Sequence, residues 1–321
     1  MTQSTTEVVD AQWRMLRTAA DSVLACPDCK GMLDVDAERR AVRCSQCRRD
    51  YPVQDGIPIL LTGRETAQKE ELAWRNAVAT PYMDSSLDAL LELIGEHHCV
   101  PVMRQHAETF KRRFAPHDWI LDIGVGLGWH WSADHAGACV LGIDASIGNL
   151  LLARRFLGPD HRRVSLVCAD AAALPVRDRS IAGVWSVQAF QHFPADVLSS
   201  VLRELHRVLQ ERFAMEIYNL HPALFLRAVY RLFGRRLHCH GATTYMELNR
   251  LSPKKWRGIW KQLRGGQPRM SHGYSELFFH PDLRCRPRPY PERLETALAA
   301  YAPLLAGLFA RQGRISIEMW A

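Results

Sequence analysis

The sequence predicts an α/β protein preceded by a small cysteine-rich module. Four of the nine cysteines form two Cys-x-x-Cys pairs between residues 26 and 47. From residue 118 onward, apolar runs of strand length alternate with segments of helical spacing. This alternation is typical of a parallel sheet covered by helices. At 321 residues, the chain has room for one α/β domain and the smaller module.

Composition and charge exclude several other classes. A hydrophobic content of 47% fits a globular protein with a sizeable core. No apolar run reaches the roughly 20 residues that a membrane helix needs, so no membrane partner is expected. Residues 1–12 lack the basic start and apolar stretch of a secretory signal. Together with an odd number of cysteines, this indicates reduced thiols and a cytoplasmic location. Nothing in the sequence specifies the oligomeric state.

The module is predicted to hold a structural zinc ion. We expect a helix over residues 1–23 and the module over residues 24–62. The Cys-x2-Cys-x14-Cys-x2-Cys spacing lies just beside that of four-thiolate zinc sites. Two disulfides, unrelated thiols or a redox pair are the alternatives. Four protein thiolates leave no open coordination position, so such a site is structural rather than catalytic. The predicted ligands are Cys26, Cys29, Cys44 and Cys47.

The segment after the second cysteine pair carries a specific resemblance. Asp55-Gly56 predicts a tight turn, and the apolar run that follows predicts a buried strand. Residues 48–61, RRDYPVQDGIPILL, resemble the closing strand of the small zinc-ribbon proteins that activate tRNA and ribosome methyltransferases. The resemblance covers residues 24–62 and implies a zinc ribbon. The matching positions are Tyr51, Pro52, Val53, Asp55, Gly56, Ile57, Pro58, Leu60 and Leu61.

A helical connector and a glycine-rich turn follow the ribbon. Residues 63–117 are predicted to be helical, because residues 86–98 and 102–114 carry apolar residues three and four positions apart. Residues 119–131, WILDIGVGLGWHW, then change to a strand that contains Asp122 and leads into three glycines. Glycine lets the backbone turn sharply and approach a ligand closely.

Four more strands are expected after this turn. The second, CVLGIDAS, reaches Asp144, which lies 22 residues after Asp122. In nucleoside-binding α/β folds, an acidic residue about 20 positions after the glycine turn binds the ribose hydroxyls. The third ends in Asp170, the fourth covers residues 181–187, and a helix over 195–210 leads to the fifth over 212–219. The site is expected at the carboxyl ends of these strands.

Residues 118–220 resemble the class I S-adenosylmethionine-dependent methyltransferases, notably the type 11 branch that includes quinone-biosynthesis C-methyltransferases. The resemblance rests on DIGVGLG, GIDAS, ADAAALP and SVQAFQHFP in that order. It implies a Rossmann-like, seven-stranded class I methyltransferase fold over residues 118–321, with S-adenosylmethionine as cofactor and residues 222–290 as a substrate cover. A dinucleotide dehydrogenase fits less well, because its third glycine lies one position farther along.

The resemblance also implies roles for single residues. The glycines pass beneath the methionine part of the cofactor, Asp144 accepts ribose hydroxyls, and Asp170 accepts from the adenine amino group. Asp122 is expected to organise the site. The two tryptophans at 129 and 131 are expected to belong to the core, with substrate stacking as the alternative. The predicted cofactor-binding residues are Asp122, Gly124, Gly126, Gly128, Asp144, Ala145, Ser146, Asp170, Ala171, Ser186 and Val187.

The acceptor side is predicted from residues beyond this common pattern. His192 is a candidate general base, because imidazole titrates near neutrality; a packing histidine is the alternative. His238 and His240 fit polar pocket groups better than metal ligands. The last two strands are expected over residues 274–281 and 314–320, with one helix over 293–311 between them. The predicted pocket residues are Gln191, Tyr218, His221 and Tyr245.

The positive charge is concentrated in one segment. The chain has a formal charge of +7, yet residues 223–269 alone carry eleven Lys and Arg and one acid. A solvated surface, an anionic small acceptor and RNA would each account for it. Ribosomal RNA guanine methyltransferases also carry an N-terminal zinc module, which favours RNA. The segment QAFQHFP lacks the proline-proline-tyrosine motif of base-amine methyltransferases, and we therefore favour a small-molecule acceptor.

Overall fold

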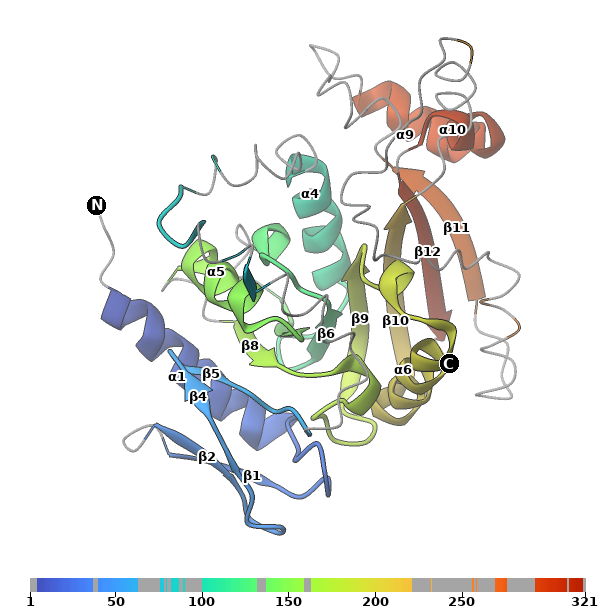
Figure 1. Cartoon of the computed structure of the whole chain (residues 1–321). Coiled ribbons are helices and arrows are strands. Elements are labelled where there is room, and N and C mark those ends of the chain that lie inside the picture. The colour runs from blue at the N-terminus through green and yellow to red at the C-terminus, as the bar shows by residue number, and fades with distance from the viewer. Residues whose placement is uncertain are drawn as a thin grey trace.

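A computed structural model gives the fold of the chain (Figure 1). It describes residues 5–36, 40–62, 76–77, 79, 82–86, 89, 100–131, 137–158, 163–220, 232, 256, 258, 269–275, 292–310 and 312–319. Among the helices of these residues, none has the length and apolar character needed to cross a membrane.

The centre of the molecule is a seven-stranded sheet in the order β11-β12-β10-β9-β6-β7-β8. Strands β8, β7, β6, β9 and β10 run parallel, whereas β12 and β11 close the sheet antiparallel. The order reverses beside β6, because the chain moves outward to β8 and returns to place β9 on the other side. Ligands of open α/β sheets bind at such a reversal. The bounds are β6 Trp119–Ile123, β7 Cys139–Asp144, β8 Val164–Cys168, β9 Ile181–Val187, β10 Leu209–Leu220, β11 Arg269–Ser275 and β12 Gln312–Met319.

Two hydrophobic clusters cover the two faces of this sheet. Alternate residues of a strand point to opposite faces, so Ile120 and Leu121 belong to different clusters. One cluster joins the sheet to α4 (Val100–Lys111) and α5 (Ile147–Leu157), as Figure 1 also shows. The other joins it to α6 (Ala195–Val208), to α1 (Thr5–Ser22) and to the cysteine module. The predicted α/β fold is confirmed.

The cysteine module is a small β structure. Strand β1 (Leu33–Asp36) pairs antiparallel with β2 (Ala41–Cys44), and β2 pairs with β3 (Asp50–Tyr51). Strands β4 (Val53–Gln54) and β5 (Ile57–Pro58) form a hairpin. Its two turn residues, Asp55 and Gly56, both have positive φ, at 52° and 82°. Two-residue hairpin turns of this kind need that backbone conformation, so the predicted tight turn is confirmed.

The N-terminal part of the chain covers the β8 edge of the sheet. The Gln12 side chain of α1 donates to the carbonyl of Val164 at 3.4 Å and accepts from the amide of Leu166 at 3.3 Å. Farther along, Ile59 forms a parallel bridge with Cys168, and the Leu60 amide donates to the Cys168 carbonyl at 2.8 Å. Backbone groups of β8 that would otherwise be unpaired are thus satisfied by α1 and the cysteine module.

Three predicted elements differ from the observed ones. A polar strand lies at Arg269–Ser275 and pairs with β12, so the sixth strand begins five residues before the predicted range of 274–281, whose residues 276–281 lie outside the described ones. It lies inside the segment that was assigned to the substrate cover. The helix predicted over 293–311 is two helices, α9 (Glu292–Tyr301) and α10 (Pro303–Phe309). Pro303 has no amide hydrogen and begins a new helix. Helix α6 ends at Val208, and β10 begins at the next residue.

Candidate functional site

The glycine-rich turn has the backbone that the sequence predicts. Gly124, Gly126 and Gly128 all have positive φ, at 70°, 54° and 62°. A side chain at Gly124 would place its Cβ 2.4 Å from the Cβ of Ala189, so this position has no room for another residue. The amides of Gly124 and Val125 both donate to the Ile143 carbonyl at 2.9 Å, which fixes the turn to the end of β7.

Asp144 connects the ends of the first two strands. One of its carboxylate oxygens accepts from the Gly126 amide at 3.0 Å, and the other accepts from the Ser146 amide at 2.8 Å. Ser146 is buried and caps α5 by accepting from the Asn149 amide. Its hydroxyl donates to Asn76 Oδ1 at 2.7 Å. Asn76 was not predicted, since no motif surrounds it in the sequence.

The ends of β8 and β9 bring the remaining predicted residues to the same edge. Asp170 is buried and caps the short helix η3 (Ala171–Ala173), accepting from the Ala172 amide at 2.8 Å. Ser186 lies at the end of β9, where its hydroxyl donates to the Ile123 carbonyl at 2.8 Å. The carboxyl ends of β6, β7, β8 and β9 therefore carry a continuous set of polar groups.

Asp122 lies below this edge and contacts the turn from inside. Its side chain is fully buried, and one oxygen accepts from Trp131 Nε1 at 2.7 Å. The same oxygen lies 2.8 Å from His130 Nε2. Trp129 and Trp131 are buried in the core, on the short helix η2 (Trp129–Trp131), so their predicted core role is confirmed. His130, to which the sequence assigned no role, is the partner of Asp122.

The predicted acceptor side is described in part. Gln191 and His192 lie on the short helix η4 (Phe190–His192), with Gln191 Nε2 3.3 Å from His192 Nε2. Tyr218 is buried, and its hydroxyl donates to Glu216 at 2.8 Å. Burial and the Glu216 charge raise the pKa of Tyr218 well above its usual value, so the phenol is neutral. The predicted residues His221, Tyr245, His238 and His240 lie outside the described residues, as does the helix predicted over 86–98 except for residues 86 and 89.

The four cysteines of the module converge on one point. Their sulfur atoms all lie within 4.8 Å of one another, with Cys29 and Cys44 3.5 Å apart and Cys26 and Cys47 3.7 Å apart. These distances exceed the roughly 2.05 Å of a disulfide bond. Ligands about 2.3 Å from a tetrahedral zinc ion are separated by about 3.8 Å, so the donor set and its spacing fit that ion.

Family comparisons agree with this division of the chain. A model described as "Methyltransferase domain" matches residues 120–212, and one described as "Trm112p-like protein" matches residues 22–56. A UPF0434 protein of Tolumonas auensis is 47% identical over 49 residues, which are 15% of this chain and 79% of the relative. One of Shewanella frigidimarina is 47% identical over 45 residues, 14% of this chain and 78% of the relative.

Solved structures with a similar fold include methyltransferases. A complex between the Haloferax volcanii Trm112 methyltransferase activator and a putative methyltransferase has a TM-score of 0.49 at 16% identity, covering 77% of this chain and 98% of that chain. An S-adenosylmethionine-dependent methyltransferase of Archaeoglobus fulgidus has a TM-score of 0.46 at 14% identity, covering 69% and 93%.

Together, the fold and the match to the methyltransferase domain model identify this chain as an S-adenosylmethionine-dependent methyltransferase. Through its N-terminal module, the chain also belongs to the Trm112p-like family that includes the UPF0434 proteins. Both resemblances drawn from the sequence are thereby confirmed.

Proposed function

We propose that the protein transfers a methyl group from S-adenosylmethionine to a small-molecule acceptor, and that a structural zinc ion stabilises its N-terminal module. The observation that carries the cofactor assignment is the contact between Asp144 and Gly126. It joins the acid expected to bind ribose to the glycine turn expected to pass beneath the methionine part. A carboxylate oxygen can accept more than one hydrogen bond, so Asp144 could also accept the ribose hydroxyls.

The other site residues take roles that follow from their positions. When bound, the cofactor supplies an electrophilic methyl group on its sulfonium. Gly124, Gly126 and Gly128 let the backbone approach it, and Asp170 with Ala171 and Ala145 would border the adenine. Ser186 and Val187 would offer backbone groups to the amino end. Asp122, through Trp131 and His130, holds the turn in place.

The acceptor would lie beside the ends of β9 and β10. His192 would remove a proton from an acceptor that needs deprotonation, and Gln191 would orient the imidazole through their 3.3 Å contact. Tyr218, His221 and Tyr245 would border the pocket. A small acceptor is supported by the segment QAFQHFP after β9, which lacks the motif of base-amine methyltransferases. Arginines of 222–290 would then pair with an anionic acceptor.

Asp144→Ala tests the cofactor site. Each lost hydrogen bond to a charged group costs about 1.5–3 kcal/mol, so S-adenosylhomocysteine should bind at least about tenfold more weakly. Titration calorimetry of the wild type, Asp144→Ala and the exposed control Asp50→Ala measures this. Undiminished affinity in Asp144→Ala would remove that residue from the site.

Metal analysis tests the zinc assignment. We expect about one zinc per chain. Replacement of Cys44 by Ser should abolish it, whereas Cys139→Ser, outside the cluster, should keep it. A purified chain without zinc, with four freely titratable module thiols, would contradict the assignment.

RNA is the second candidate acceptor, favoured by the charge of residues 223–269. The module also exposes Arg40, Arg43 and Arg48. If RNA is the acceptor, its binding should fall steeply with salt, since each neutralised phosphate releases counterions. Each single replacement of Lys254, Lys255 or Arg257 by Gln should reduce the slope of RNA affinity against salt concentration by about one unit on logarithmic scales. Such a result, together with methyl incorporation into purified RNA, would overturn the small-molecule assignment. For a small anionic acceptor, single arginine replacements in 222–290 should instead raise its KM.

A further inference from the structure

The segment that follows Asp170 is held by the N-terminal module. Residues 174–177 leave η3 and run beside residues 23–25, which enter the first cysteine pair. The Ala25 amide donates to the Pro175 carbonyl at 3.0 Å, and the Arg177 amide donates to the Val23 carbonyl at 2.8 Å. Leu24 and Val176 form an antiparallel bridge between these contacts.

Arg177 strengthens the same junction with its side chain. The guanidinium donates to the carbonyls of Ala20 at 2.5 Å, Asp21 at 2.8 Å and Leu24 at 3.0 Å. These carbonyls lie at and just beyond the end of α1, where a helix leaves acceptors unpaired and a cation is favourable. The end of α1 and the segment after η3 therefore form one hydrogen-bonded unit.

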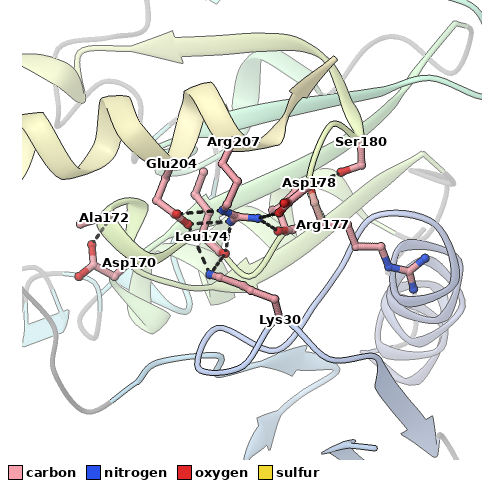
Figure 2. Close-up of polar contacts among 10 residues, drawn as sticks. Lys30, Asp170, Ala172, Leu174, Arg177, Asp178, Ser180, Glu204 and Arg207 are labelled. Carbon is pink, nitrogen blue, oxygen red and sulfur yellow. Dashed lines mark hydrogen bonds and ion pairs between the residues drawn. The ribbon is translucent and has the colours of Figure 1, made fainter. Parts of the chain in front are cut away.

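Lys30 connects the module to the residue that directly follows η3. It follows Cys29 directly, and its positive φ of 60° places it in a left-handed turn. Figure 2 shows its ammonium reaching across to the methyltransferase domain, where it donates to the Leu174 carbonyl at 3.0 Å. It also lies 3.5 Å from Glu204 Oε2 on α6.

Two groups on α6 complete this arrangement. Arg207 donates to the same Leu174 carbonyl at 3.1 Å and to Glu204 at 2.7 Å, as Figure 2 shows. Burial raises the pKa of Glu204, but Arg207 and Lys30 more than offset it, so the net shift is downward and the carboxylate is charged. One backbone carbonyl thus accepts from a cation of the module and from a cation of the domain.

That carbonyl belongs to the residue that directly follows η3. Leu174 is the C-cap of η3, and Asp170 is its N-cap. The Ala173 amide donates to the Asp170 carbonyl at 3.0 Å, so the turn between the two residues is closed. A single short helical turn therefore connects Leu174 to Asp170.

We propose that Lys30 is a positioning residue for cofactor binding: it holds Leu174, and through η3 it sets where the Asp170 carboxylate and the Ala171 amide meet the adenine. The module therefore contributes to cofactor affinity as well as to stability. This inference rests on the proposed function, in which Asp170 and Ala171 border the adenine.

Calorimetry with S-adenosylhomocysteine on the full chain tests the proposal. Lys30→Met keeps an unbranched apolar side chain and removes the charge, whereas Lys30→Arg keeps the charge. Couplings through such contacts are worth 0.5–2 kcal/mol, so Lys30→Met should bind about 2- to 30-fold more weakly, at full zinc content. Lys30→Arg should recover most of that loss. Arg43→Gln, on the exposed side of the same module, should bind like the wild type.

A second ligand and a second variant separate positioning from loss of folding. Methylthioadenosine has the adenosine part but no amino acid, so Lys30→Met should weaken its binding by a similar factor. Glu204→Gln removes a Lys30 partner without changing the module and should weaken binding in the same direction. Melting temperatures are recorded for every variant, and binding is measured well below them.

The outcomes distinguish the two proposals. If the wild-type chain binds both ligands, and Lys30→Met and Glu204→Gln bind them with unchanged affinity, this inference is overturned. The proposed function then still stands. Equal losses in Lys30→Met, Lys30→Arg and Arg43→Gln would also overturn it, because they would show a general effect of the module. A wild-type chain that binds neither ligand would overturn the proposed function and this inference with it.

Discussion

The two edges of the central sheet are protected in different ways. Strand β8 is buried along its whole length, and its edge is covered by Gln12 of α1 and by Ile59 and Leu60 of the module. At the other edge, β11 exposes Arg269, Ser271 and His272, and among the described strands it pairs with β12. An apolar parallel edge strand needs a cover, whereas a polar antiparallel one tolerates water. The module is therefore the lateral neighbour that β8 requires.

This difference divides the site as well. Asp144 ends β7 and Asp170 follows β8, on the half of the sheet that the module covers. The predicted acceptor residues His192 and Tyr218 belong to the half formed by β9, β10 and β12. A change in the module should therefore affect the cofactor side first, and a change near β12 should affect the acceptor side.

The largest expected effect comes from breaking the module itself. Cys26→Ser removes one of four thiolates and should destabilise the module by on the order of 5 kcal/mol, since structural zinc sites supply about 10–16 kcal/mol of folding free energy. Hydrogen exchange should then accelerate in α1 and β8 but not in β11 and β12. Cys139→Ser is the control. Equal acceleration at both edges would show that the two halves of the sheet do not differ.

A smaller effect is expected on the opposite half of the sheet, where the protonation of His106 changes the stability with pH. Its imidazole on α4 lies 3.4 Å from the Tyr218 hydroxyl, which in turn contacts Glu216. Burial and the charge of Arg314 lower the pKa of His106 to about 4. As the pH falls below about 6.5, the unfolded chain binds a proton that the folded chain refuses, so the free energy of unfolding decreases until about pH 4.

Denaturant unfolding between pH 7 and pH 4 measures this contribution. At most about 3 kcal/mol of stability should be lost over that range through His106, and His106→Gln should flatten the profile accordingly. The control is His117→Gln, whose side chain is 87% exposed. A profile of unchanged steepness in His106→Gln would assign the pH dependence to other groups.

The smallest effect comes from the amide that covers β8. Gln12→Met keeps the buried volume but leaves the Val164 carbonyl and the Leu166 amide without the Gln12 partner. We expect the free energy of unfolding to fall by about 1–3 kcal/mol, with faster amide hydrogen exchange confined to β8. Gln46→Met, on the exposed part of the module, should change neither. A uniform loss of protection would mean that Gln12 stabilises the fold as a whole.

The sequence predicted the parts of the site that depend on local pattern. The glycines at 124, 126 and 128 signal their own positive φ, and buried strand runs precede Asp144 and Asp170. The cysteine spacing likewise predicted that the four sulfurs converge. Such features need only neighbouring residues, so the order of residues is enough to find them.

Features that depend on distant partners could not be predicted. Lys30 follows a cysteine pair as an ordinary exposed lysine would, and only the fold places Leu174 beside it. Asn76 has no motif, yet it contacts the start of α5. Strand β11 contains Arg269, Ser271 and His272 and lacks an apolar run, so its strand structure depends on pairing with β12.

The junction of the module with the domain also bears on how the chain folds. Lys30 and Glu204 are 174 residues apart in sequence, and Gln12 and Leu166 are 154 apart. During synthesis, the module and α1 leave the ribosome long before β8 and α6 exist, and closing such long loops slows folding. The part of α1 that contacts β8 therefore gains this partner only after the middle of the chain has been made. We therefore expect the β8 edge to be completed late, when the first part of the chain docks on strands made after it.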